Sequence, residues 1–290
     1  MYCIYHSRDL DGWMSAAIVK MWYEKTKPDG ELELIGWDYG QMLPIFNTEG
    51  HAELFMVDIS FPMPTMESLL DPFRVTWIDH HESAINERRQ YFTKNNPFAG
   101  LQFSDYAACE LTWMHLFDGK KMPEIVRLLG RYDCFGHKGT KEELKVLEFQ
   151  YGARQLIGNV EDAYHYLAIA RGRGDWSFDS DLCEEIHLKG QAIYAYLCSE
   201  AKHSYKKIFP IYIDGYKFAC INQERFNPIN FGIDYHKDGY DGFACFWYQN
   251  GKFTYSLYND NGEVDCSVIA KKRGGGGHKG AAGFQRDQII

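Results

Sequence analysis

The stretch VTWIDHH, residues 75–81, joins a short apolar run to an acidic residue and two histidines. A short apolar run of this kind is typical of a buried strand in a parallel sheet. Three earlier segments have a similar character, namely YCIY at 2–5, LELIGW at 32–37 and ELFMVD at 53–58. The sequence therefore predicts several buried strands in the N-terminal part of the chain.

Helical segments lie between these predicted strands. Residues 13–25, WMSAAIVKMWYEK, carry apolar residues at helical spacing. Residues 64–70, PTMESLL, begin with Pro64, and proline is favoured in the first turn of a helix. Because strands that alternate with helices indicate a parallel sheet with crossover connections, we expect an α/β fold with flanking helices.

The second half of the chain has a different character. The sequence is largely helical from about Ala107 towards His203, and strand-like segments follow Tyr205. We therefore expect an α/β domain at 1–180, a helical linker at 181–205 and a smaller α/β domain at 206–290. A glycine-rich run, GGGGHKGAAG, occupies residues 274–283.

The composition excludes several classes of protein. The 290 residues carry a formal net charge of -9, which argues against duplex DNA as a ligand because duplex binding draws on a broad basic face. No stretch approaches the ~18 apolar residues that span a bilayer, and we see no secretion signal. The eight cysteines form no C-x-x-C pair, which argues against a structural zinc site or a disulfide framework. We expect a cytoplasmic protein without a membrane partner.

Acidic residues follow the predicted strands. Asp9 and Asp11 come after the first strand, Asp58 ends another, and Asp79 ends a third, directly before the two histidines. The carboxyl ends of parallel strands share one edge of a sheet, where ligands bind. Carboxylates gathered there would repel one another unless metal ions lay between them, and carboxylate and imidazole ligands suit Mn, Mg or Fe.

A pair of such ions would give the site a hydrolytic chemistry. Two ions about 3.5–4 Å apart that share a carboxylate activate water and hold both oxygens of a phosphoryl transfer. Each feature alone also has a simpler interpretation: a solvated loop for D-x-D, a helix start capped by Asp79 for the histidines, and a flexible linker for the glycine run. Their joint occurrence in this order favours the metal site.

The order of these motifs resembles the DHH phosphoesterase family with its DHH-associated C-terminal domain, in particular the oligoribonuclease or nano-RNase-like branch. The resemblance spans Ile4 to Phe284. The matching residues are, in chain order, His6, Asp9 and Asp11 for the first motif, Asp58 for the second, Asp79-His80-His81 for the signature, Asp133 for the fourth, and GGGGHKGAAGF at 274–284 for the C-terminal domain.

The resemblance implies roles for these residues. Residues 1–180 would form the catalytic domain, and 206–290 the substrate-binding domain. Two Mn²⁺ ions would be the cofactor, with Mg²⁺ or Co²⁺ as alternatives. The implied ligands are His6 and Asp9 for one ion, Asp11, His80 and Asp133 for the other, and Asp58 as the bridge. Asp79 would orient a ligating histidine, and His81 would face the scissile phosphate.

The glycine run predicts a clamp for a substrate phosphate. Glycines let a phosphate approach the backbone closely, and their amides can point at its oxygens. Neighbouring side chains would add further hydrogen-bond donors. The expected substrate-binding residues are Arg273, Gly275, Gly276, Gly277 and His278.

These features predict a metal-dependent phosphodiesterase that hydrolyses short oligonucleotides or small nucleotide phosphates by two-metal activation of water. The alternatives are a cyclic-dinucleotide phosphodiesterase, a bisphosphate nucleotidase or, in a different class, a catalytically silent nucleotide-binding module. The expected partners are a short RNA or DNA oligonucleotide or a small nucleotide, with no long duplex, and a homodimer is a further option.

Overall fold

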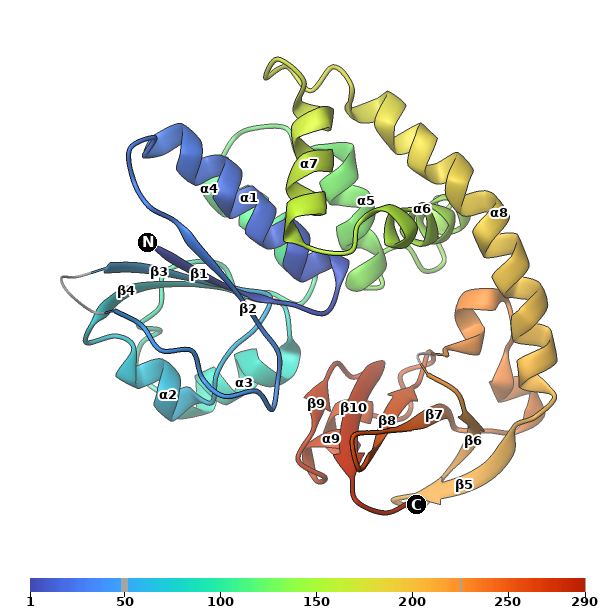
Figure 1. The fold of residues 1–290 in the computed structure, drawn as a ribbon. Coiled ribbons are helices and arrows are strands. Elements are labelled where there is room, and N and C mark those ends of the chain that lie inside the picture. Colours follow the sequence, from blue (N-terminus) through green and yellow to red (C-terminus); the bar gives the residue numbers. More distant parts are fainter. Residues whose placement is uncertain (48–51, 225, 290) are drawn as a thin grey trace. The chain divides into compact units, whose positions relative to one another are not determined.

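The computed structural model describes residues 1–47, 52–224 and 226–289 (Figure 1). The chain forms two compact units, Met1–Ile193 and Tyr194–Ile290. The division falls inside helix α8 (Asp179–Tyr205), which covers the segment predicted as a linker. The functional boundaries at 180 and 205 stay a prediction.

A four-stranded parallel sheet organises the first unit, with the strand order β2-β1-β3-β4. The strands are β1 (Tyr2–His6), β2 (Glu33–Trp37), β3 (Ala52–Val57) and β4 (Phe73–Ile78). The helices are α1 (Leu10–Thr26), α2 (Met63–Ser68), α3 (Glu82–Tyr91), α4 (Ala108–Leu116), α5 (Glu124–Asp133), α6 (Glu143–Leu156) and α7 (Val160–Arg171). The predicted α/β fold with a parallel sheet is confirmed.

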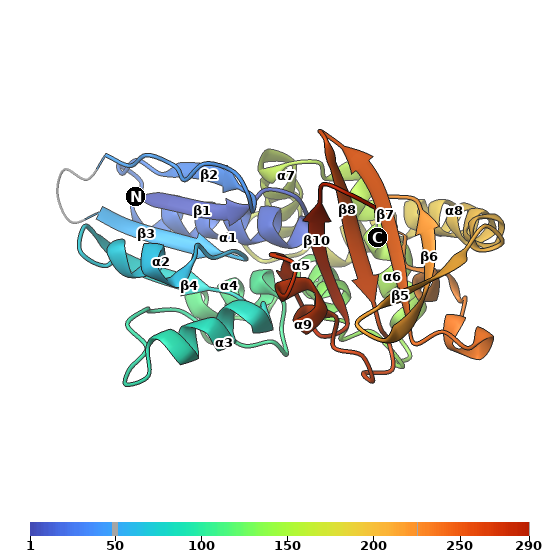
Figure 2. The same ribbon diagram turned by 90° about the horizontal axis from the view of Figure 1, so that it is seen from below.

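Helices cover both faces of this sheet (Figures 1 and 2). Successive side chains of a strand point to opposite faces. Ile4 and Leu54 accordingly join a core with Met63 of α2. Cys3 and Phe55, one position along, join a separate core with residues of α1 and α4. Burial on both faces explains why the strands are apolar without alternation.

A third core lies among helices α1, α4, α5, α6 and α7 and the start of α8. Two glycines let α6 and α8 cross closely. A Cβ atom on Gly190 would lie 1.7 Å from the carbonyl oxygen of Glu148, and one on Gly152 would lie 2.1 Å from that of Ile186. Any side chain at either position would therefore separate the two helices.

The second unit is built on a six-stranded mixed sheet, in the order β5-β6-β7-β8-β10-β9. Among the described strands of this unit, β6 and β7 pair in parallel and the other pairs are antiparallel. Its elements are β5 (Phe209–Ile213), β6 (Tyr216–Asn222), η1 (Pro228–Phe231), η2 (Tyr235–Asp238), β7 (Gly242–Gln249), β8 (Lys252–Tyr258), α9 (Cys266–Lys271), β9 (Gly276–Gly277) and β10 (Ala281–Arg286). Cores lie on both faces of this sheet as well.

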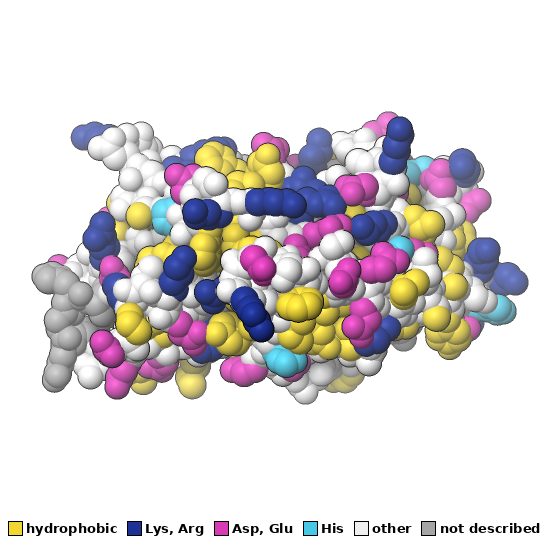
Figure 3. Space-filling view, turned by 90° about the horizontal axis from the view of Figure 1, so that it is seen from above, with side chains coloured by type: hydrophobic (Ala, Val, Ile, Leu, Met, Phe, Trp, Pro, Cys, Tyr) yellow, Lys and Arg dark blue, Asp and Glu magenta, His cyan; other side chains and the backbone are white. Residues whose placement is uncertain are grey.

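The surface carries charges of both signs. On the face drawn in Figure 3, basic and acidic side chains lie beside one another, with apolar side chains between them. In the described ranges, no helix combines the length and apolarity that crossing a bilayer requires.

Candidate metal centre

The site is assembled at the carboxyl edge of the parallel sheet. His6 ends β1, Asp58 follows β3, and Asp79 follows β4. Helix α1 starts beside β1, and Asp9 caps it by accepting a hydrogen bond from the Gly12 amide at 3.0 Å. Because β1, β3 and β4 are parallel neighbours, their last residues meet at this edge.

The first cluster of ligand atoms surrounds the ring of His6. Its Nδ1 atom lies 2.9 Å from Oδ2 of Asp9 and 3.4 Å from Oδ2 of Asp58. The three ligand atoms lie within 4.8 Å of one another, a spacing that fits a single cation. These are the residues that the sequence predicted for one ion and for the bridge.

The second cluster surrounds the buried ring of His80. Its Nε2 atom lies 3.4 Å from Oδ2 of Asp11, 3.2 Å from Oδ2 of Asp133 and 3.2 Å from Oδ1 of Asp58. Asp58 thus turns one oxygen to each cluster. This is the geometry that a carboxylate bridging two cations requires.

Asp58 itself shows that the residues fit metal ions. Its side chain is 1% exposed, and neither carboxylate oxygen accepts a hydrogen bond from the described residues. Its contacts are the rings of His6 and His80, and burying a carboxylate without hydrogen bonds is costly. A bound cation would remove that cost. Asp58 also has a φ of 61°, a conformation that few non-glycine residues adopt and that is common at functional sites.

The ionisable groups of the two clusters shift one another's pKa values. Burial lowers the pKa of His6, but Asp9, Asp38 and Asp58 outweigh it and raise that pKa well above the usual value. Burial also raises the pKa of Asp11, and the neighbouring carboxylates raise it further. The cluster therefore holds protons in the absence of cations, and a bound cation would displace them.

Asp11 is fixed by a helix that is distant in sequence. Its Oδ2 accepts a hydrogen bond of 2.9 Å from the Ala108 amide, and its Oδ1 accepts one of 2.7 Å from the Cys109 amide. Both amides belong to the first turn of α4, where backbone N–H groups lack partners within the helix. The start of α4 therefore sets the position of one predicted metal ligand.

Next to Asp133, the last residue of α5, lies a partly buried ion pair. Arg131 donates from Nε to Oε1 of Glu110 at 3.0 Å, and its Nη2 contacts the other oxygen of the same carboxylate. Glu110 also accepts a hydrogen bond from the Ala107 amide at 3.1 Å. The pair therefore ties the C-terminal turn of α5 to the start of α4.

Asp79 contacts the ring of His81. Its Oδ1 lies 2.7 Å from Nδ1 of His81 and accepts hydrogen bonds from the His80 amide at 2.7 Å and the His81 amide at 3.0 Å. The Asp79 carboxylate accepts hydrogen bonds from the two backbone amides just before α3, and it therefore lies beside the ring of His81, two residues further along the chain. Asp79 therefore lies against the ring of His81, and its role in orienting a ligating histidine stays a prediction.

Asp38 also lies at this site, although it was not predicted from the sequence. Its Oδ1 lies 3.6 Å from Nε2 of His6, and its Oδ2 lies 3.6 Å from Nε of Arg8. Asp38 directly follows β2, just as Asp58 follows β3 and Asp79 follows β4. The pattern of an acid after a predicted strand could therefore have identified it.

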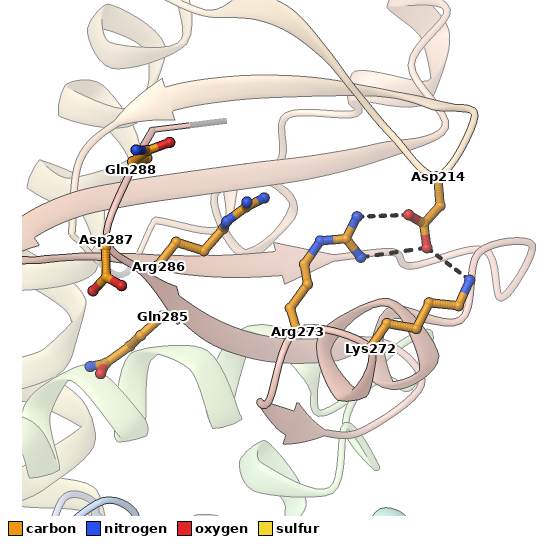
Figure 4. Close-up of a pocket in the computed structure, with 7 residues that line it drawn as sticks. All are labelled: Asp214, Lys272, Arg273, Gln285, Arg286, Asp287 and Gln288. Atoms are coloured by element: carbon orange, nitrogen blue, oxygen red, sulfur yellow. Dashed lines mark hydrogen bonds and ion pairs between the residues drawn. The ribbon is translucent and has the colours of Figure 1, made fainter.

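The five predicted substrate-binding residues belong to the second unit. Arg273 is engaged there, because its Nη2 donates to Oδ1 of Asp214 at 2.7 Å and its Nη1 donates to the Ile269 carbonyl at 2.9 Å. Lys272 binds the same aspartate at 3.0 Å (Figure 4). Arg273 and Lys272 lower the pKa of Asp214 to about 2. These side chains line a pocket of ≈ 610 Å³ together with Gln285, Arg286, Asp287 and Gln288.

The glycine run forms one side of a β-hairpin. Gly276 and Gly277 pair with Gly283 and Ala282 of β10. The Gly275 amide donates to the Ala270 carbonyl at 2.9 Å, and the His278 amide donates to the Ala281 carbonyl at 2.7 Å, so these two donors serve the fold. A Cβ atom on Gly275 would lie 1.9 Å from the Gly283 carbonyl oxygen, so close strand contact already requires glycine there. A phosphate-binding role for the run stays a prediction.

Comparison with solved structures identifies the fold. An exopolyphosphatase-related protein from Bacteroides fragilis superimposes with a TM-score of 0.55 at 13% identity, over 100% of this chain and 87% of that chain. In the protein described here, the motif residues of the DHH signature lie together at one edge of the parallel sheet. The chain has a DHH-type fold.

Two further structures align over most of this DHH-type chain with lower scores. The pGpG-specific phosphodiesterase PggH from Vibrio cholerae gives a TM-score of 0.49 at 12% identity, with 98% of this chain and 93% of that chain covered. The exonuclease RecJ bound to manganese gives 0.48 at 16% identity, with 99% and 86% covered. No protein-family model and no curated protein sequence matches the chain.

Proposed function

We propose that this protein is a metal-dependent phosphoesterase of the DHH family that hydrolyses short oligonucleotides or small nucleotide phosphates. One observation carries the proposal. Two clusters of carboxylate and imidazole atoms share the buried Asp58, which turns one oxygen to each cluster. Oxygen and nitrogen ligands of this kind suit Mn²⁺ or Mg²⁺.

Seven side chains have distinct tasks in this proposal. His6, Asp9 and Asp58 would hold one cation, and Asp11, His80 and Asp133 would hold the second with Asp58 between them. Two divalent cations supply an activated water and charge stabilisation for phosphoryl transfer. His81 would act on the leaving group. Burial lowers the pKa of His81, but Asp79 outweighs it and raises that pKa above the usual value, which supports a role as proton donor.

A short substrate agrees with the charge of the protein. The net charge of -9 disfavours long nucleic acids, whose affinity comes from many phosphate contacts. A ligand with few phosphates needs only a few local donors and the cations themselves. We extend the proposal to the 206–290 region, with Arg273, Gly275, Gly276, Gly277 and His278 as substrate contacts.

The decisive experiment is a product profile with purified protein. The substrates are RNA and DNA of two to five nucleotides, a cyclic dinucleotide, a 3′,5′-bisphosphorylated nucleoside and pyrophosphate, each with Mn²⁺ or with EDTA. Mononucleotide release from the short oligonucleotides, dependent on Mn²⁺, is the expected result. Hydrolysis of only the cyclic substrate would favour a cyclic-dinucleotide phosphodiesterase, and hydrolysis of only the bisphosphorylated substrate would favour a bisphosphate nucleotidase. Binding without any product would identify a silent nucleotide-binding module.

A further inference from the structure

One arginine of the first unit stands apart from its neighbours. Arg127 and Arg131 of α5 are both engaged by carboxylates, Glu142 and Glu110 respectively. Arg154, in the last turn of α6, is exposed, and no carboxylate of the described residues lies within ion-pair distance of it. An arginine without a carboxylate, next to a helix that ends in a predicted metal ligand, requires an explanation.

Aromatic rings hold the guanidinium of Arg154 in place. Its Cζ atom lies 5.2 Å from the ring centroid of Tyr132 and 5.2 Å from that of Tyr151. Tyr132 is itself fixed, because the buried His137 stacks on it with centroids 5.5 Å apart and an interplanar angle of 5°. Cation–π contacts of this kind restrain the guanidinium without using its N–H groups.

The N–H groups of Arg154 are therefore mostly available. The single hydrogen bond that it makes in the described chain is a long one, 3.4 Å from Nη2 to the Tyr132 hydroxyl. A guanidinium offers five donors in a planar fork that matches the oxygens of a phosphate. The ring that the guanidinium contacts belongs to Tyr132, which immediately precedes Asp133, a predicted ligand of the second cluster. Asp133 is close enough to contribute to raising the pKa of Arg154.

We propose that Arg154 binds a phosphate group of the substrate beside the metal centre. This assignment rests on the proposed function and adds a residue to it. The paired tyrosines keep the fork in position before the substrate arrives, which lowers the entropy cost of binding. The alternative is a purely structural role, in which Arg154 only offsets the helix dipole at the end of α6. In that case replacing Arg154 would leave phosphate affinity unchanged.

The test uses Arg154→Gln and Arg154→Lys in the full chain, with Arg171→Gln as the matched control. Arg171 occupies the last turn of α7, and its charge acts on Glu24, far along α1 from Asp9 and Asp11. Calorimetry would measure the affinity of the Mn²⁺-loaded protein for inorganic phosphate, and electron paramagnetic resonance would measure Mn²⁺ affinity. Steady-state kinetics with bis(p-nitrophenyl) phosphate would separate KM from kcat.

For Arg154→Gln we expect phosphate affinity to fall about 10- to 100-fold, the usual worth of charged hydrogen bonds, with Mn²⁺ affinity and Tm unchanged. Arg154→Lys should recover part of the loss, because it keeps the charge but not the fork. Phosphate affinity within about 2-fold of wild type, or an equal loss in Arg171→Gln, would overturn the assignment. The phosphate titration does not depend on turnover, so an inactive wild type would count against the proposed function alone.

Discussion

At the scale of single residues, Asp58 is the most informative position. Asparagine tolerates its left-handed backbone conformation but removes the shared charge. We expect Asp58→Asn to reduce hydrolysis more than about 100-fold and to weaken Mn²⁺ binding, with only a modest loss of metal-free stability because the carboxylate also lies beside the rings of His6 and His80. Turnover assays and metal-free thermal melts check this. Asp118→Asn, at an exposed position, is the control, and full Mn²⁺-dependent activity in Asp58→Asn would remove the bridge from the proposal.

Asp38 offers a second prediction at this scale. Its carboxylate faces Nε2 of His6, which leaves Nδ1 directed at Asp9 and Asp58. We expect Asp38→Asn to weaken Mn²⁺ binding about 10- to 100-fold, the usual cost of removing a group that orients a ligating histidine. Activity should return at high Mn²⁺ concentration, which a general folding defect would not allow. An Mn²⁺ titration of activity equal to that of exposed Asp71→Asn would show that Asp38 has no such role.

At the scale of helices and strands, the close crossing of α6 and α8 contributes to the stability of the helical layer. Gly190→Ala would place a methyl group 1.7 Å from the Glu148 carbonyl oxygen. We expect a loss of about 1–3 kcal/mol in the free energy of unfolding, the usual cost of inserting a methyl group into a close-packed contact. Urea unfolding of the metal-free protein measures it.

The control for this crossing is Gly158→Ala, because the nearest atom to a Cβ there is Oδ2 of Asp162 at 3.6 Å. That change should stay within about 0.5 kcal/mol of wild type. If the two variants unfold at the same urea concentration, the helices can separate without cost and the crossing does not depend on glycine.

At the scale of the whole molecule, metal binding should be linked to protons. Burial lowers the pKa of His80, but Asp133, Asp58 and Asp11 outweigh it and raise that pKa well above the usual value, as the acids around His6 do for that ring. Both rings must lose a proton to bind a cation. Mn²⁺ affinity should therefore rise with pH and weaken as pH falls, with about one to two protons released on binding at neutral pH.

Calorimetry in two buffers of different ionisation enthalpy counts those protons. Since cations bind the folded protein, the free energy of unfolding should also rise by about 2.7 kcal/mol at an Mn²⁺ concentration 100 times the Kd. Mn²⁺ binding without proton release would contradict the assignment of His6 and His80. Asp58→Asn serves as the comparison, because it should lose most of the stabilisation by Mn²⁺.

The sequence alone determined the α/β class, the parallel strands and the acids that follow them, because strand and helix periods and strand ends are local properties of the chain. The tertiary structure decided what depends on contacts between distant segments. Those contacts direct the two oxygens of Asp58 to different clusters, place Asp79 against His81 and bring Asp38 to His6. They also use the amides of Gly275 and His278 within the fold and leave Arg154 between two tyrosines. Side-chain direction depends on neighbours that local sequence does not specify.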